Sequence, residues 1–215
     1  MKPNGLTLLF TLAVFAGGLV ATVCAGDPGP VSDAAREAFL RSFKRTGLNT
    51  TPGDAMVLRI LVETSQAKRG VEIGTATGFG ALNMGIGFER NGGHLVSVDI
   101  DPAMVKAARE NIARAGLDKT VTVIEGDALK VLPALEGEYD FVFIDALKRD
   151  YLKYFQAMSP KLKRGAVVVA DNVIKSAHDM KDFLDYMENN PDYEKVIIRA
   201  SEEKGDGMAI YYKIR

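Results

Sequence analysis

The stretch Val71-Glu72-Ile73-Gly74-Thr75-Ala76-Thr77-Gly78-Phe79-Gly80 decides the fold of this chain. Apolar residues typical of a buried strand lead into a glycine-rich turn, and an apolar stretch with helical character follows. Glycines between a strand and a helix let the backbone approach a ligand closely, where the helix presents its free N–H groups. The stretch therefore predicts a site for a nucleotide-like ligand. Its glycines lack the spacing, two and then three residues apart, that is typical of dinucleotide-binding turns.

Outside this stretch, strand-like and helix-like segments alternate. The alternation predicts a doubly wound α/β fold with a mostly parallel, Rossmann-like sheet of seven strands. The last two strand-like runs are joined by the short polar turn 201–207, which predicts an antiparallel pair at the sheet edge. We expect helices over 31–45, 54–66, 102–115, 128–135, 151–162 and 176–187, and further strands over 94–98, 121–125, 141–144, 166–170, 196–198 and 208–212.

The composition is that of one globular domain, expected over residues 31–215. The chain has 215 residues, of which 47% are hydrophobic and 26% charged, and its formal net charge is -1. Because acidic and basic residues are interspersed, we expect no basic surface for nucleic acid. The single cysteine, Cys24, precedes the domain, which excludes a disulfide or a cysteine metal site within it.

The N-terminus has the pattern of an export signal. Residues 6–23 are mostly apolar, and small residues follow, with a cleavage site best placed after Ala25. We therefore expect residues 1–25 to be a signal peptide and the domain to be exported or periplasmic. The alternative is an uncleaved membrane anchor, since a spanning helix needs roughly 17–25 residues. In that case the domain faces the cytoplasm, and the basic residues that follow the run are compatible with this orientation.

Acidic residues recur at the ends of the predicted strands. Ligands of an open parallel sheet bind outside the carboxyl ends of its strands, so a repeated polar residue at this place predicts a site. Acids are also common in turns and at helix N-caps, but five in the same topological place exceed that expectation. They are Glu72 within the first strand, Asp99, Asp127 and Asp145 at the next three, and Asp171 with Asn172 at the fifth.

Asp99 is the candidate for ribose binding. It follows the glycine-rich turn by somewhat over about 20 residues, where nucleotide-binding folds place an acid on the ribose hydroxyls. The alternative is a cap for the helix that begins at Pro102, although Asp101 is better placed to be that cap.

Asp145, Asp171 and Asn172 are candidate metal ligands. If strands 141–144 and 166–170 are neighbours, three oxygen donors meet, and oxygen ligands suit Mg²⁺ or another hard divalent cation. The alternative is a pair of turn-forming acids. Lys148 lies three residues after Asp145, so a helical turn would point it to the same side. Near a cation and partly out of water, a lysine becomes a candidate general base, although an isolated lysine is more often a solvated surface residue.

Five motifs together resemble the metal-dependent O-methyltransferases related to catechol and caffeoyl-CoA O-methyltransferases. The similarity runs from about residue 31 to the C-terminus, with every motif in order. The motifs are Val71-Glu72-Ile73-Gly74-Thr75-Ala76-Thr77-Gly78-Phe79, Val98-Asp99-Ile100-Asp101-Pro102, Glu125-Gly126-Asp127-Ala128, Phe143-Ile144-Asp145-Ala146-Leu147-Lys148 and Ala170-Asp171-Asn172-Val173.

The resemblance implies S-adenosylmethionine as cofactor, Mg²⁺ as metal, a catechol-like small-molecule substrate and a homodimer. It implies that Asp145, Asp171 and Asn172 hold the metal and that Lys148 is the general base. The implied cofactor contacts are Glu72, Gly74, Thr75, Gly78 and Gly80 at the amino-acid end, Asp99 at the ribose, Asp127 and Ala128 beside the adenine, and Asp145.

Three positions depart from the family pattern. Gly80 stands where relatives usually carry serine, and Ala146 and Leu147 stand where the mammalian catechol enzymes have a histidine and an aromatic residue. Substrate identity therefore does not transfer from the family. Alternative functions are methylation of an RNA hydroxyl, a nicotinamide-dependent dehydrogenase and a non-catalytic binding domain. The absent basic patch and the signal-like N-terminus count against the first, and the glycine spacing counts against the second.

Overall fold

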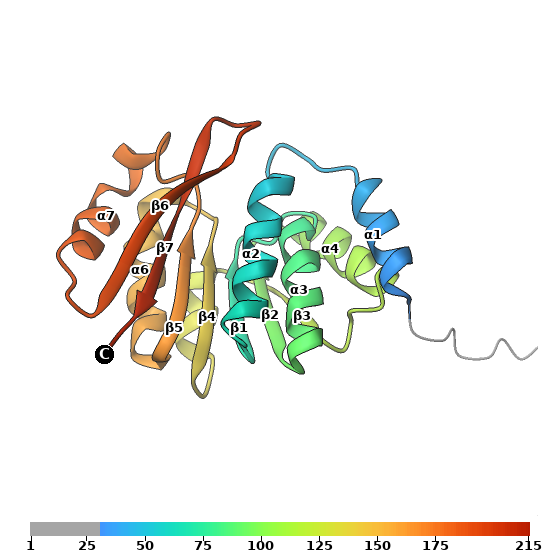
Figure 1. Cartoon of the computed structure of the whole chain (residues 1–215), viewed down its shortest axis with the longest axis horizontal. Helices are drawn as coiled ribbons and strands as arrows, with labels where there is room; N and C mark the ends of the chain where they lie inside the picture. Colours follow the sequence, from blue (N-terminus) through green and yellow to red (C-terminus); the bar gives the residue numbers. More distant parts are fainter. Residues whose placement is uncertain (1–30) are drawn as a thin grey trace, which may run out of the picture. The chain divides into compact units, whose positions relative to one another are not determined.

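A computed structural model describes residues 31–215, so the predicted signal or anchor lies outside the described residues. Their fold is a seven-stranded sheet with the order β3-β2-β1-β4-β5-β7-β6 (Figure 1). The strands are β1 Arg69–Ile73, β2 His94–Asp99, β3 Val121–Glu125, β4 Tyr139–Ile144, β5 Leu162–Ala170, β6 Tyr193–Ser201 and β7 Asp206–Lys213. In this part of the chain, no helix combines the length and apolar character needed to cross a membrane.

Five parallel strands end at one level of the sheet. In the pairing register, Ile73 of β1 lies beside Val98 of β2 and Ile144 of β4, and Ile144 lies beside Ala170 of β5. The residues after these strands therefore share one edge. β7 pairs antiparallel with β5 and β6, which confirms the predicted antiparallel pair.

Two hydrophobic cores cover the two faces of the sheet, because strand side chains alternate in direction. In β4, Phe141 and Phe143 pack in the core with helices α2, α3 and α4. Val142 and Ile144 pack in the other core with α5, α6 and α7. The helices are α1 Asp33–Arg41, α2 Pro52–Thr64, α3 Phe79–Asn91, α4 Pro102–Arg114, α5 Ala128–Ala134, α6 Tyr151–Met158 and α7 Lys181–Glu188.

Several element boundaries differ from the sequence expectation. The first helix begins where predicted, with Ser32 as N-cap accepting from the Ala35 N–H, but it ends at Arg41 rather than at residue 45. Helix α6 ends at Met158, and Pro160 follows in a short 3₁₀ helix before β5 begins. Proline cannot donate a backbone hydrogen bond and disfavours a helical residue before it, so the single helix predicted for 151–162 is divided.

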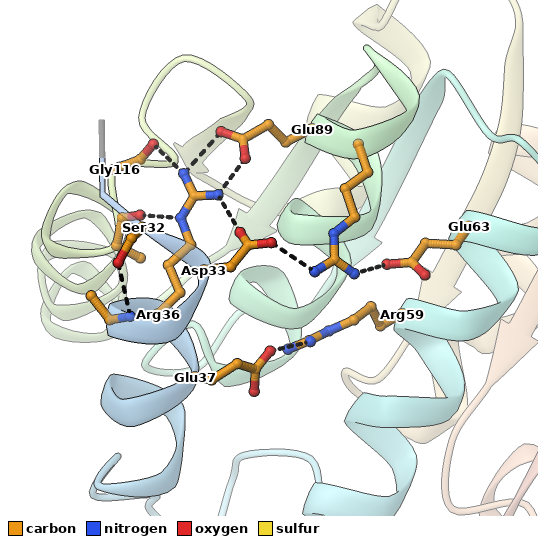
Figure 2. Close-up of polar contacts among 11 residues, drawn as sticks. Ser32, Asp33, Arg36, Glu37, Arg59, Glu63, Glu89 and Gly116 are labelled. Atoms are coloured by element: carbon orange, nitrogen blue, oxygen red, sulfur yellow. Dashed lines mark hydrogen bonds and ion pairs between the residues drawn. The ribbon is translucent and has the colours of Figure 1, made fainter. Parts of the chain in front are cut away.

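An ion-pair network fixes α1 to the rest of the domain. The guanidinium of Arg36 contacts Glu89 of α3 and donates to the carbonyl oxygen of Ala115 at 2.8 Å (Figure 2). Arg59 of α2 contacts Glu37 of α1 in the same region. Anchoring α1 in this way fixes the start of the loop that leads from α1 to α2.

Candidate active site

A cavity of about 730 Å³ lies at the carboxyl ends of the parallel strands. Its lining includes seven of the predicted site residues, namely Gly74, Asp99, Asp127, Ala128, Asp145, Lys148 and Asn172. The others do not line the cavity and are buried, namely Glu72, Thr75, Gly78, Gly80 and Asp171. The structure thus places seven of the predicted residues in the cavity wall and the other five in the buried interior.

The glycine-rich turn lies directly against the start of the β4–α6 connection. Gly74 has a φ of 96°, which favours glycine, and a Cβ there would overlap the carbonyl oxygen of Asp145. The backbone N–H of Asp145 donates to the carbonyl oxygen of Ile73 at 2.8 Å, and that of Gly74 donates to Val98 at 2.9 Å. The start of the glycine-rich turn is therefore held by backbone hydrogen bonds to Asp145 on one side and to Val98 on the other.

Asp99 orders this turn from the end of β2. One of its carboxylate oxygens accepts from the backbone N–H groups of Thr75 at 3.0 Å and Ala76 at 2.8 Å. Asp99 is only half-buried and lines the cavity, so its remaining acceptor capacity is available there. The helix-cap alternative is met by Asp101, which accepts from the Ala103 N–H at 2.8 Å. Asp127 likewise caps α5 while lining the cavity.

Glu72 is a buried carboxyl beneath the turn. It accepts a hydrogen bond from the hydroxyl of Ser97, which also contacts the Thr75 hydroxyl. Burial raises the pKa of Glu72 well above its ordinary value, although the Ser97 hydrogen bond opposes the shift. A Cβ at Gly80 would lie 2.6 Å from Oε1 of Glu72 and 3.6 Å from the Thr50 hydroxyl. Glycine at position 80 thus leaves room for the Glu72 side chain.

Lys148 lies in the short 3₁₀ helix Lys148–Asp150, as the predicted helical turn requires. Its Nζ donates to Oδ1 of Asp145 at 2.9 Å and to the hydroxyl of Tyr151 at 2.8 Å. That hydroxyl donates to the carbonyl oxygen of Asp171 at 3.2 Å. Sequence reasoning missed Tyr151, although its place three residues after the lysine was a signal that could have revealed it.

Asp171 carries a carboxylate that is not fully compensated. Its Oδ1 accepts from the N–H of Asn172 at 2.7 Å, while Oδ2 is buried and has no partner among the described residues. Burial and then the charge of Asp145 raise the pKa of Asp171 to about 8. With the amide of Asn172, the donor set is two carboxylates and one amide oxygen at neighbouring strand ends. This set fits a hard divalent cation, which would neutralise the carboxylates.

Asp206 holds the loop that carries Asn172. It accepts from the backbone N–H groups of Ile174 at 3.1 Å and Lys175 at 3.0 Å, and from Nδ2 of Asn172 at 3.4 Å. Burial acts to raise the pKa of Asp206, but backbone hydrogen bonds from Lys175, Gly207 and Ile174 lower it overall. Sequence reasoning missed this residue because it assigned residues 201–207 to a polar turn, whereas Asp206 begins β7.

The rim of the cavity combines apolar side chains with one lysine. Leu48, Ile100 and Leu147 line the cavity and are largely exposed. Lys204, at the tip of the β6–β7 hairpin, also lines it and donates to the carbonyl oxygen of Asn49 at 2.9 Å. Figure 1 shows this hairpin reaching past the sheet toward the loop between α1 and α2.

The comparisons with known proteins agree with this arrangement. Residues 33–195 match the model of the O-methyltransferase family. The chain is 36% identical to a catechol O-methyltransferase of Niastella koreensis over 66% of this chain and 67% of the relative. It is 31% identical to a catechol O-methyltransferase of Mycobacterium tuberculosis over 86% and 89% of the two chains.

Solved structures show the same fold with ligands bound. The O-methyltransferase TomG of Streptomyces achromogenes in complex with SAM superimposes with a TM-score of 0.74 at 26% identity, over 85% of this chain and 89% of TomG. The O-methyltransferase of Bacillus cereus in complex with SAH gives a TM-score of 0.73 at 25% identity, over 85% and 91%. With its Rossmann-like sheet and the cavity at the strand ends, the chain belongs to the O-methyltransferase family and is an S-adenosylmethionine-dependent O-methyltransferase of the catechol and caffeoyl-CoA type.

Proposed function

We propose that this enzyme methylates one hydroxyl of a catechol-like small molecule, with Mg²⁺ or another divalent cation held by Asp145, Asp171 and Asn172 and with Lys148 as general base. The observation that carries the proposal is the contact of Lys148 Nζ with Asp145 at 2.9 Å, in the wall where Asp145 adjoins the glycine-rich turn. Lys148, Asp145 and the glycine-rich turn therefore lie side by side in this wall of the cavity.

The metal part of the proposal is supported by the donor set at the ends of β4 and β5. Oδ2 of Asp171 is buried without a partner among the described residues, and the charge of Asp145 helps to raise the pKa of Asp171, so a cation beside these two side chains would be favourable. Asp145, Asp171 and Asn172 would hold the cation, whose positive charge would lower the pKa of a nearby phenol. Lys148 then takes the phenolic proton at Nζ, and Tyr151 holds the lysine at the cavity wall.

The cofactor part of the proposal is supported by other residues that line the cavity. Asp99 offers its free acceptor capacity to the ribose hydroxyls, and Asp127 and Ala128 line the wall where the adenine would lie. Methyl transfer is a direct displacement, so the role of these residues is to fix the donor in line with the acceptor oxygen.

A small aromatic acceptor is supported by the cavity and by the relatives. Leu48 and Leu147 at the rim offer apolar surface to a ring. The cavity volume of about 730 Å³ is in the range of small-molecule sites. Two relatives carry the name catechol O-methyltransferase.

Calorimetry with S-adenosylmethionine, followed by a methylation assay on 3,4-dihydroxyphenyl compounds with and without EDTA, tests the proposal. We expect cofactor binding and chelator-sensitive methylation. Absence of methylation would contradict the acceptor class, and activity unchanged by EDTA would contradict only the metal. Asp171→Ala should abolish methylation while cofactor binding persists, and equal loss of both would contradict separate sites.

Export, membrane anchoring and dimerisation stay predictions. They rest on residues 1–25 and on family resemblance, and the mass of the native protein will show whether the chain is cut after Ala25. Sedimentation of the purified enzyme will show its oligomeric state.

A further inference from the structure

Lys204 lines the cavity, and within residues 31–215 it takes part in no ion pair. Its Nζ donates to the carbonyl oxygen of Asn49 at 2.9 Å, and this acceptor is neutral. An ammonium group carries more than one N–H donor, so the contact leaves donor capacity unused. The side chain is half-buried at the tip of the β6–β7 hairpin. Lys204 therefore presents a positive charge at the rim that the described residues do not balance.

The other charged side chains that line the cavity are already engaged. Lys148 pairs with Asp145 at 2.9 Å, and Asp150 pairs with Lys153 at 2.7 Å. The remaining acids of the lining accept hydrogen bonds from backbone N–H groups, namely Asp99, Asp101 and Asp127. Among the residues that line the cavity, no acid therefore neutralises Lys204.

A purely structural role for Lys204 would be to hold the hairpin against the loop between α1 and α2, which it reaches in Figure 1. Neighbouring contacts already join these segments. Arg45 of the loop pairs with Glu203 at 3.0 Å, and Gly53 of α2 packs closely on the carbonyl group of Ala200 in β6. Holding the hairpin in place therefore does not require a charge at position 204.

The hairpin brings Lys204 to the part of the cavity that holds the acceptor in the proposed reaction. Two residues after Lys204, Asp206 contacts Nδ2 of Asn172 at 3.4 Å. On the opposite side, the exposed Leu48 precedes Asn49, whose carbonyl oxygen accepts from the lysine. An acceptor whose hydroxyl lies near Asn172 and whose ring packs on Leu48 can therefore extend its other end toward Lys204.

We propose that Lys204 binds a carboxylate on the methyl acceptor, so that the enzyme prefers catechols that carry a carboxylic acid over their neutral counterparts. A lysine and a carboxylate form a charge-assisted hydrogen bond, which is stronger than a neutral one. The inference rests on the catechol-like acceptor of the proposed function. The methionyl carboxylate of the cofactor offers the same chemistry, so the test separates the two sources.

Steady-state kinetics with acceptors that differ in charge test this inference. The two pairs are 3,4-dihydroxybenzoate with its amide and 3,4-dihydroxycinnamate with its amide, which place the carboxylate at different distances from the ring. The measured quantity is the ratio of kcat/KM for acid and amide, compared between enzyme variants so that differences in phenol reactivity cancel. In Lys204→Met this ratio should fall about tenfold for the acid that reaches the lysine, as for one lost hydrogen bond between charged groups.

Two further variants control for this change. Lys204→Arg keeps the charge and should retain the ratio. Lys175→Met removes the same charge beside Gly205 of the same hairpin, but Lys175 does not line the cavity, so its ratio should equal that of the wild type. Calorimetry on protein saturated with S-adenosylhomocysteine should show the same order for the Kd of the acids. The Kd of S-adenosylmethionine should not change in Lys204→Met.

An unchanged ratio in Lys204→Met would overturn the inference. Equal losses for acid and amide would also overturn it, because the lysine would then only hold the hairpin. Weaker binding of S-adenosylmethionine with an unchanged ratio would assign Lys204 to the cofactor, and an equal fall in Lys175→Met would replace the contact by a long-range field. If the wild type binds S-adenosylmethionine but methylates none of the acceptors, the acceptor class of the proposed function is wrong, and the role of Lys204 with it.

Discussion

The hydroxyl of Tyr151 accepts a hydrogen bond from Nζ of Lys148 at 2.8 Å and donates one to the carbonyl oxygen of Asp171 at 3.2 Å. This buried tyrosine therefore ties the general base of the proposed reaction to the end of β5. The lysine is held from two sides, since Asp145 accepts its other hydrogen bond.

Tyr151→Phe should lower kcat about tenfold at saturating cofactor, because a general base contributes about 10²–10⁴-fold only when it is positioned. The free energy of unfolding should fall by about 1 kcal/mol, as for one lost hydrogen bond. Tyr211→Phe is the control, since Tyr211 is buried in the same core. An unchanged kcat for Tyr151→Phe would show that Lys148 needs no support from the tyrosine.

Gly80→Ser should strengthen S-adenosylmethionine binding several-fold, by about 1 kcal/mol for one added hydrogen bond. The new Cβ would lie 2.6 Å from Oε1 of Glu72, so the carboxyl end of this buried side chain must shift to admit it. Gly80→Ala isolates the steric effect, and calorimetry gives the affinity of each variant. If alanine and serine bind the cofactor equally, the hydroxyl contributes nothing at this position.

Glu72→Gln should stabilise the cofactor-free protein increasingly as pH rises. Burial raises the pKa of Glu72, so between the unfolded value near 4.3 and the higher folded value the native state binds more protons than the unfolded state. The free energy of unfolding of the wild type therefore falls with pH in this window, by at most about 1.4 kcal/mol per pH unit from this group. Glutamine has no such proton to lose.

Thermal unfolding of the wild type and Glu72→Gln from pH 5 to pH 8 checks the sign. The difference in Tm should widen with pH in favour of glutamine. Glu125→Gln, at an exposed glutamate of β3, controls for the change in net charge. If the difference in Tm between Glu72→Gln and the wild type narrows as pH rises, the native state favours the ionised form of Glu72.

Arg36→Met should lower the free energy of unfolding by about 2–3 kcal/mol, because it leaves Glu89 and the Ala115 carbonyl without their donor. The loss is smaller than for a fully buried pair, since Glu89 is partly exposed. Arg90→Met, at an exposed arginine of the same network, should cost no more than about 1 kcal/mol. Urea unfolding measures both, and equal losses would show that burial of Arg36 does not matter.

The sheet and the predicted wall of the site could be read from the sequence because their signals are local. An apolar run that ends in an acid appears at Asp99 and at Asp145, and both lie where the strand pattern predicts. The pairing of β4 with β5, which the metal-site hypothesis assumed, is present in the structure.

Residues that act across the fold could not be predicted in this way. Asp206 lies outside the matched motifs, and it reaches the loop that carries Asn172 because β7 pairs with β5. The predicted ends of elements were also imprecise. Helix α6 ends earlier than predicted, since the short 3₁₀ helix that contains Pro160 lies between α6 and β5.

The overlap that any side chain at position 74 would make with the Asp145 carbonyl has a consequence for engineering the enzyme. The glycine-rich turn and Asp145 are packed and hydrogen-bonded together, so neither can be redesigned independently of the other. Substitutions that change which methyl acceptors bind must therefore be made at the rim. There, Leu48, Leu147 and Lys204 belong to three separate connections. Libraries confined to these three positions would vary selectivity while leaving Lys148, the proposed base, unaltered.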